Sequence, residues 1–158
     1  ATVLDAAASL EGVQVLAALG EDAPRWRDRA LPANVAVFGR VPQLRVIERS
    51  AVVVSTGGLN TGHEALWFGV PVLNIPIAGV DTPGNAARLV HHGVGRRLRR
   101  REVSVDAVRR ELRTLLDDPG YRERAAQLSH SLRAWIGVAA AAGAYAVRDP
   151  AAPAGAAG

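Results

Sequence analysis

Short apolar runs rich in β-branched residues alternate with segments of helical spacing through most of the chain. Four runs lack polar alternation, which is typical of strands buried on both faces; they span residues 13–19, 35–38, 51–55 and 70–75. The segments of helical spacing span residues 2–10, 44–49, 60–68 and 85–92. Repeated strand–helix units predict an α/β fold, a Rossmann-like parallel sheet with helices on both faces. A further short strand at 95–98 brings the expected number of strands to about five.

The C-terminal part of the chain has the pattern of helices alone. Ser104 is a favoured N-cap residue for a helix that ends near Leu116. Asp118 is a second N-cap residue, and Pro119 stands at the first position of the next helix. This last helix is expected to reach about Trp135. The fold is therefore expected to end in a helical C-terminus.

A single domain is expected to account for most of the chain. The 158 residues suit one hydrophobic core. We expect the domain to comprise residues 1–148, with the Ala-rich stretch 138–147 available to extend the last helix. Residues 149–158 are almost entirely Ala, Gly and Pro and are expected to form a disordered tail.

Several classes of protein are excluded by what the composition lacks. The absence of cysteine excludes disulfide bonds, thiolate metal sites and a cysteine nucleophile. No apolar run approaches the ~20 residues that span a bilayer, and no export signal opens the chain. We therefore expect a cytoplasmic protein with no membrane span. The sequence does not indicate an oligomeric state.

The basic residues, 19 in number and all arginine, give the chain a net charge of +4. A basic surface suits phosphate-bearing ligands. The densest group comprises Arg96, Arg97, Arg99, Arg100 and Arg101. Because no aromatic residue interrupts this group, stacking on nucleic-acid bases is not indicated. We expect a solvated strand end and loop here, and no nucleic-acid partner.

The strongest candidate site lies in residues 55–66, after the third predicted strand. In open parallel sheets, ligands bind beyond the carboxyl ends of the strands. Gly57 and Gly58 let the backbone approach a ligand, and the helix start that follows offers free amide donors and partial positive charge. Side-chain donors are added by Thr56, Asn60 and Thr61. The segment predicts a phosphate cradle, although it matches neither G-x-G-x-x-G nor the P-loop.

Glu64 lies one turn into this predicted helix, on roughly the same face as Asn60. Its carboxylate is suited to accept hydrogen bonds from ribose hydroxyls. A plain tight turn with a helix cap explains the two glycines equally well. The helix dipole alone also favours a glutamate in this position. Both interpretations stay open on the residues alone.

Two further loops leave the same edge of the predicted sheet. Residues 38–43 follow the second strand, and residues 76–85 follow the fourth. The later loop carries Asp81 and Thr82, an acidic residue and a hydroxyl that suit hydroxyl-rich ligands. Ordinary turn chemistry would also explain the prolines and glycines of this loop.

These loops together resemble one family over residues from about 34 to 132. The resembling segments are VPQLRVIERSAVVVSTGGLNTGHEALWFGVPVLNIP, DTPGNAARLVHHGVGRRL and LLDDPGYRERAAQL. They are similar to the C-terminal, donor-binding domain of the two-domain GT-B glycosyltransferases. The nearest branch is the bacterial natural-product enzymes similar to macrolide glycosyltransferases, which are relatives of the plant and animal UDP-sugar transferases.

The resemblance implies a role for each candidate residue. The base-binding loop of the family usually reads Trp-x-Pro-Gln; its place here is taken by Arg40, Val41, Pro42 and Gln43. The guanidinium of Arg40 would stack on the base in place of the ring, and Gln43 would meet the base. Glu64 would bind the ribose, whereas Asp81 and Thr82 would bind sugar hydroxyls. The diphosphate would be held by Thr56, Gly57, Gly58, Asn60 and Thr61.

Several positions depart from the family pattern. Thr56 stands where a histidine usually touches a phosphate, and a neutral donor contributes about 1 to 2 kcal/mol less than a charged one. Thr82 replaces a glutamine, which indicates a deoxysugar donor with fewer hydroxyls or a site without turnover. His63 replaces an apolar residue and is expected to pack. His91 and His92 are adjacent on a helix and point ~100° apart, so they are not expected to share a metal.

The resemblance also implies a reaction. The family moves a sugar from a UDP or dTDP sugar to an acceptor hydroxyl with inversion, and no cofactor or essential metal is expected. The general base of the family raises the reaction rate by a factor of roughly 10² to 10⁴. It lies on an N-terminal domain, and neither that domain nor the first strand of the donor domain is recognised in this sequence. The expected partners are a nucleotide-diphosphate sugar and a small-molecule acceptor. Two alternatives stay open: a non-catalytic sugar-nucleotide-binding or partner module with a degenerate site, and a glycolipid or cell-wall transferase.

Overall fold

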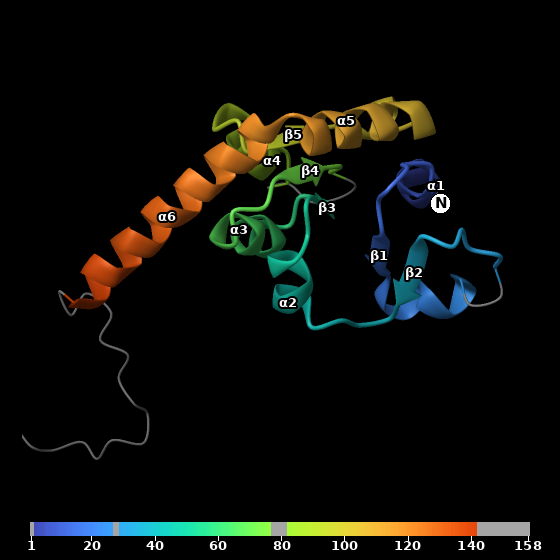
Figure 1. The fold of residues 1–158 in the computed structure, drawn as a ribbon, viewed down its shortest axis with the longest axis horizontal. Helices are drawn as coiled ribbons and strands as arrows, with labels where there is room; N and C mark the ends of the chain where they lie inside the picture. Colours follow the sequence, from blue (N-terminus) through green and yellow to red (C-terminus); the bar gives the residue numbers. More distant parts are fainter. Residues whose placement is uncertain (1, 27–28, 77–81, 142–158) are drawn as a thin grey trace, which may run out of the picture.

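A computed structural model of the protein describes residues 2–26, 29–76 and 82–141 (Figure 1). Its strands are β1 (Val15–Ala18), β2 (Val35–Phe38), β3 (Val53–Ser55), β4 (Val72–Asn74) and β5 (Gly95–Arg97). Its α-helices are α1 (Thr2–Ala8), α2 (Gln43–Glu48), α3 (Leu59–Trp67), α4 (Thr82–His91), α5 (Val105–Asp117) and α6 (Pro119–Ala141). Two 3₁₀ helices, η1 (Gly20–Trp26) and η2 (Arg100–Glu102), complete the described elements.

All pairs of neighbouring strands are parallel, which confirms the predicted α/β class. The strands form two sheets and not the single sheet that the alternation suggested: β1 pairs with β2, and the order in the other sheet is β3-β4-β5. In the described residues no ladder joins β1 to β3. Consistent with this open edge, Leu16 and Val54 are exposed apolar residues on these two strands.

Two apolar cores lie on opposite faces of the three-stranded sheet. The core formed with α1 and α5 contains Ala6, Ala7, Leu10, Leu73, Ile75, Leu98, Ala107, Val108, Leu112 and Leu115. The core formed with α2, α3, α4 and α6 contains Ile47, Ala65, Leu66, Val70, Val72, Leu89, Val94 and Ala125. Along β4, Leu73 and Val72 enter different cores, because successive side chains of a strand point to opposite faces. Helices therefore cover both faces, as predicted.

Both predicted N-caps of the C-terminal helices are confirmed. The backbone N–H of Ala107 donates to Ser104 Oγ at 3.1 Å, and that of Gly120 donates to Asp118 Oδ1 at 2.9 Å. Helix α6 continues beyond Gly137 to Ala141 and extends away from the rest of the domain (Figure 1). The predicted tail, 149–158, lies outside the described residues.

The predicted elements exist, but their ends differ. Helix α4 starts at Thr82, three residues earlier than expected, since proline is tolerated in a first helical turn. Strands β1 and β4 are shorter at both ends than the apolar runs suggested, β3 begins two residues later, β5 ends one residue earlier, and β2 matches. The η1 helix was not predicted. Within the described residues, no helix has the length and apolar character needed to cross a membrane.

Candidate functional site

The predicted phosphate cradle is the turn that connects β3 to α3. Strand β3 ends at Ser55, which is buried. The backbone N–H of Gly57 donates to Ser55 Oγ at 3.1 Å and thereby closes a tight turn. Gly57 adopts φ 90°, which residues with a side chain rarely adopt. The glycine and the buried serine together define the path of the chain into the helix.

Helix α3 begins at this turn with backbone donors that have no partner among the described residues. Gly58 is its N-cap, and no side chain caps the helix. The first backbone bond of the helix runs from the N–H of Gly62 to the carbonyl of Gly58. The amides of Leu59, Asn60 and Thr61 precede that bond and have no partner within the helix. They carry the partial positive charge of the helix start, where anions are stabilised.

The cradle is accessible from solvent. Thr56, Gly58 and Asn60 are exposed, and Thr61 is half-buried. Two surface hollows lie elsewhere, one around α1 and β1 and one between α2 and the start of α6, and neither includes a cradle residue. The arrangement is therefore an open surface with several donors, to which an anion has free access.

The predicted base-binding and ribose-binding residues meet in the structure. Gln43, the first residue of α2, donates from Nε2 to Oε2 of Glu64 on α3 at 2.5 Å. Arg40 is exposed and Val41 half-buried in the preceding loop. The second loop and the cradle thus lie side by side, although 21 residues separate Gln43 from Glu64.

The third loop is only partly described. Asp81 lies outside the described residues, and of Thr82 only the backbone position, at the start of α4, is described. The proposed sugar contacts of these two residues stay predictions. The C-terminal half of α4 packs on α3, because a Cβ added to Gly62 of α3 would meet Leu89 of α4 at ordinary contact distance.

The histidines do not form a metal site in the described part of the chain. His63 is exposed, so the expected packing role is wrong: the side chain points away from the core that buries Ala65 and Leu66. The rings of His91 and His92 lie 5.3 Å apart in an edge-to-face arrangement, and both residues are exposed. Within the described residues, no group of three or more His, Asp or Glu residues is placed to hold a metal ion.

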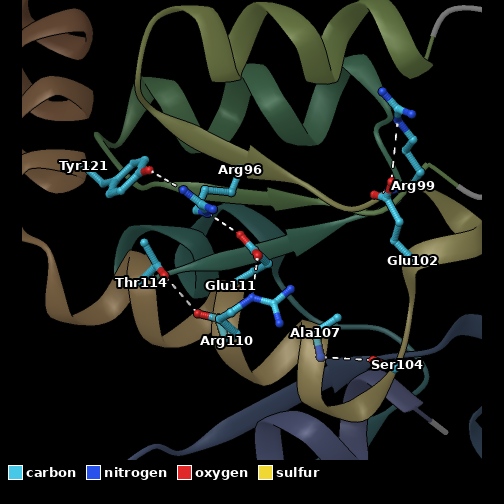
Figure 2. A network of polar contacts seen from close by, with 9 residues as sticks. All are labelled: Arg96, Arg99, Glu102, Ser104, Ala107, Arg110, Glu111, Thr114 and Tyr121. Carbon is cyan, nitrogen blue, oxygen red and sulfur yellow. Dashed lines mark hydrogen bonds and ion pairs between the residues drawn. The ribbon is translucent and has the colours of Figure 1, made fainter.

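Arg96 corrects the expectation of a fully solvated arginine cluster. Figure 2 shows its guanidinium paired with Glu111 of α5, and its Nη1 donates to the hydroxyl of Tyr121 at 2.9 Å. The hydrogen bond to Glu111, together with that to Tyr121, raises the pKa of Arg96 above its ordinary value. Glu111 is buried and also accepts from Arg110. This network ties β5 to α5 and α6.

Sequence reasoning missed Glu111, although a signal was present. It stands in the apolar stripe of α5, between Val108 and Leu112, at the spacing of a buried helix face. A carboxylate in such a position requires a partner, because burying an unpaired charge is costly. Candidate partners were present in the arginine group at residues 96–101 and in Arg110.

The structure is a parallel α/β domain in which an open, uncapped helix start follows the third strand. A Gln–Glu pair lies beside this helix start. Together these features are the architecture of a nucleotide-binding half-domain. Residues 1–135 match the family described as "Erythromycin biosynthesis protein CIII-like, C-terminal domain". The chain belongs to this family and is a glycosyltransferase C-terminal domain of the GT-B fold.

Individual relatives agree with this assignment. The chain is 30% identical over 142 residues to zeaxanthin glucosyltransferase of Pantoea ananas, covering 89% of this chain and 32% of the relative. Among solved structures, the glycotransferase of kitacinnamycin has a TM-score of 0.74 at 34% identity, covering 84% of this chain and 34% of that one. Glycosyltransferase VinC, solved in complex with dTDP, has a TM-score of 0.74 at 26% identity, covering 82% of this chain and 32% of that one. The chain thus spans about a third of the length of each.

Proposed function

We propose that this chain binds the nucleoside diphosphate part of a UDP or dTDP sugar, and that the whole protein transfers the sugar to the hydroxyl of a small-molecule acceptor with inversion. The observation that carries the proposal is the start of α3, where uncapped amides are exposed beside the Gln43–Glu64 pair. Support also comes from VinC, a similar structure that was solved with dTDP.

The cradle would act on the leaving group. As the bond between sugar and diphosphate breaks, negative charge grows on the diphosphate. Fixed donors aimed at that charge stabilise the transition state more than the ground state. The amides of Leu59, Asn60 and Thr61 would be those donors, so we propose that no metal ion is essential.

The remaining roles are divided between the two neighbouring loops. The exposed guanidinium of Arg40 would stack on the base. Gln43 would meet the base and hold the carboxylate of Glu64, which would accept hydrogen bonds from the ribose. Asp81 and Thr82 would contact the sugar. The general base would lie on an acceptor-binding domain.

A binding panel tests the proposal. UDP, dTDP, ADP and GDP are each titrated into the chain in a calorimeter, with and without excess EDTA. We expect saturable binding of UDP or dTDP in preference to the purine nucleotides, and affinity that EDTA does not change. Absence of binding by any diphosphate would reject the proposal, and loss of binding in EDTA would reject the metal-free cradle. Binding without transfer after the acceptor domain is supplied would favour a non-catalytic module.

Replacing Glu64 with alanine is expected to weaken binding of UDP about tenfold, or ~1.4 kcal/mol, because hydrogen bonds between a carboxylate and the ribose hydroxyls are lost. The effect is measured by calorimetry on the wild-type chain and E64A. A nucleotide without ribose hydroxyls, 2′,3′-dideoxyuridine diphosphate, serves as the matched ligand and should bind both proteins equally. Equal loss for both nucleotides would show that Glu64 does not contact the ribose.

A further inference from the structure

Three polar side chains form a row across the carboxyl ends of β3, β4 and β5. Ser55 is in register with Asn74, and Asn74 is in register with Arg97. The ladder continues to this end of the sheet, because Leu98 donates to the carbonyl of Asn74 at 2.9 Å. Neighbouring strands lie about 5 Å apart, so the three side chains start from adjacent points along one line.

The three side chains share the face of the sheet that α3 and α4 cover. Side chains two residues apart on a strand point the same way. Val53, two residues before Ser55, packs against the core that contains Ala65 and Leu66 of α3, and Val72, two residues before Asn74, belongs to that core. A Cβ on Gly95, two residues before Arg97, would meet Leu89 of α4.

Asn74 has an unsatisfied donor in this row. Asn74 is only 1% exposed, and its side-chain Nδ2 has no hydrogen-bond partner in the described structure. Buried amide groups are almost always hydrogen-bonded, because desolvating one without a partner is unfavourable. An apolar residue would fill the end of β4 without this penalty. The unpaired amide therefore indicates an acceptor that the described residues do not supply.

Arg97 differs from its neighbour Arg96 in having no acceptor among the residues that the structure describes. Arg96 points to the α5 face and is fully engaged by Glu111 and Tyr121 (Figure 2). Arg97 is half-buried on the opposite face, and no hydrogen bond or ion pair within the described residues involves its guanidinium. Since the two arginines are adjacent on a strand, the sheet directs Arg96 to a structural role and places the positive charge of Arg97 beside Asn74, without an acceptor in the described part of the chain.

Ser55 connects this row to the cradle. Its Oγ accepts the N–H of Gly57 at 3.1 Å, so its own O–H stays available as a donor. The row thus contains a hydroxyl, an amide and a guanidinium, and each offers a proton. An oxyanion is the ligand that such a set of donors fits, because charged hydrogen bonds between guanidinium and anionic oxygen are the strongest of this kind.

We propose that Ser55, Asn74 and Arg97 form an oxyanion subsite adjoining the cradle, filled by an anionic oxygen of the bound donor. The inference rests on the proposed function and goes beyond it in naming these residues. The anionic oxygen comes either from the terminal phosphate or from an acidic group on the sugar. In either position, Arg97 supplies the cation that the neutral Thr56 does not.

The test compares three ligands with two variants and one control. UMP, UDP and UDP-glucuronic acid are titrated into the wild-type chain, R97Q and N74L. R100Q is the matched control, since Arg100 is an exposed arginine in η2 outside the row and its replacement removes the same charge. We expect R97Q and N74L to bind at least one of UDP and UDP-glucuronic acid about tenfold more weakly, whereas R100Q changes little.

The pattern of loss identifies the source of the oxyanion. Loss for UDP and UDP-glucuronic acid, but not UMP, assigns the terminal phosphate. Loss for UDP-glucuronic acid alone assigns the acidic sugar. If R97Q and R100Q have the same affinity for every ligand, the subsite proposal is overturned. This comparison does not depend on whether N74L folds. Wild-type chain that binds none of these uridine ligands and also no dTDP would instead reject the proposed function.

Discussion

Replacing Gly58 with valine is expected to weaken binding of UDP or dTDP about a hundredfold, or ~2.7 kcal/mol, while the domain stays folded. The backbone of Gly58 has φ −59° and ψ 135°, which valine adopts readily. Among the described residues, and apart from the two chain neighbours of Gly58, a Cβ at this position meets no atom within 4 Å. The fold therefore does not require glycine here, but a diphosphate lying on the α3 amides would meet the added methyl groups.

The effect on binding is separated from the effect on folding by a graded series. G58A and G58V are compared by calorimetry for affinity and by thermal unfolding for stability. Affinity should fall with the size of the side chain, whereas the melting temperature should stay within a few degrees of wild type. A valine variant with wild-type affinity would mean that no ligand approaches this backbone.

Replacing Gly95 with alanine is expected to destabilise the domain by about 3 kcal/mol, which lowers the melting temperature by roughly 10 °C in a chain of this size. The added Cβ would lie 2.5 Å from the backbone oxygen of Val72. Relief of that clash requires β5 to move away from β4, because the opposing atom belongs to the backbone and not to a flexible side chain.

The matched control for Gly95 is Gly62 of α3. A Cβ on Gly62 would meet Leu89 Cδ1 at 3.6 Å, which is an ordinary contact, and alanine in a helix is favoured over glycine by about 0.5–1 kcal/mol. G62A should therefore match or slightly exceed wild type in thermal unfolding. Equal stability of G95A and G62A would contradict the close approach of β4 and β5.

Local sequence signals predicted most of the fold because they have local physical causes. The apolar run at β4 reflects burial on both faces, whereas β2, which was expected to be buried likewise, exposes Ala36 and Phe38. The caps at Ser104 and Asp118 reflect the need of helix starts for acceptors. The division of the strands into two sheets was not predicted. Strand pairing depends on contacts between segments far apart in the chain, and the pattern within β1 or β3 carries no information on its neighbour.

The candidate site was predicted in part. The glycine turn after β3 and a helix that contains Glu64 follow from spacing, and the structure has both, whereas the ligand roles of these residues stay predictions. The Gln43–Glu64 contact and the opposite orientations of Arg96 and Arg97 required the tertiary arrangement. Because side chains alternate between the two faces of a strand, the sequence could have placed Arg96 and Arg97 on opposite faces of β5. Only the packing of α5 shows that Arg96 is the one with an acidic partner.

A crystal structure of this chain with dTDP or UDP bound tests the central claim most directly. We predict that diphosphate oxygens lie within hydrogen-bond distance of the backbone nitrogens of Leu59, Asn60 and Thr61, with the ribose beside Glu64. A nucleotide bound elsewhere on the domain, or a helix start that stays empty at saturating nucleotide, would contradict it.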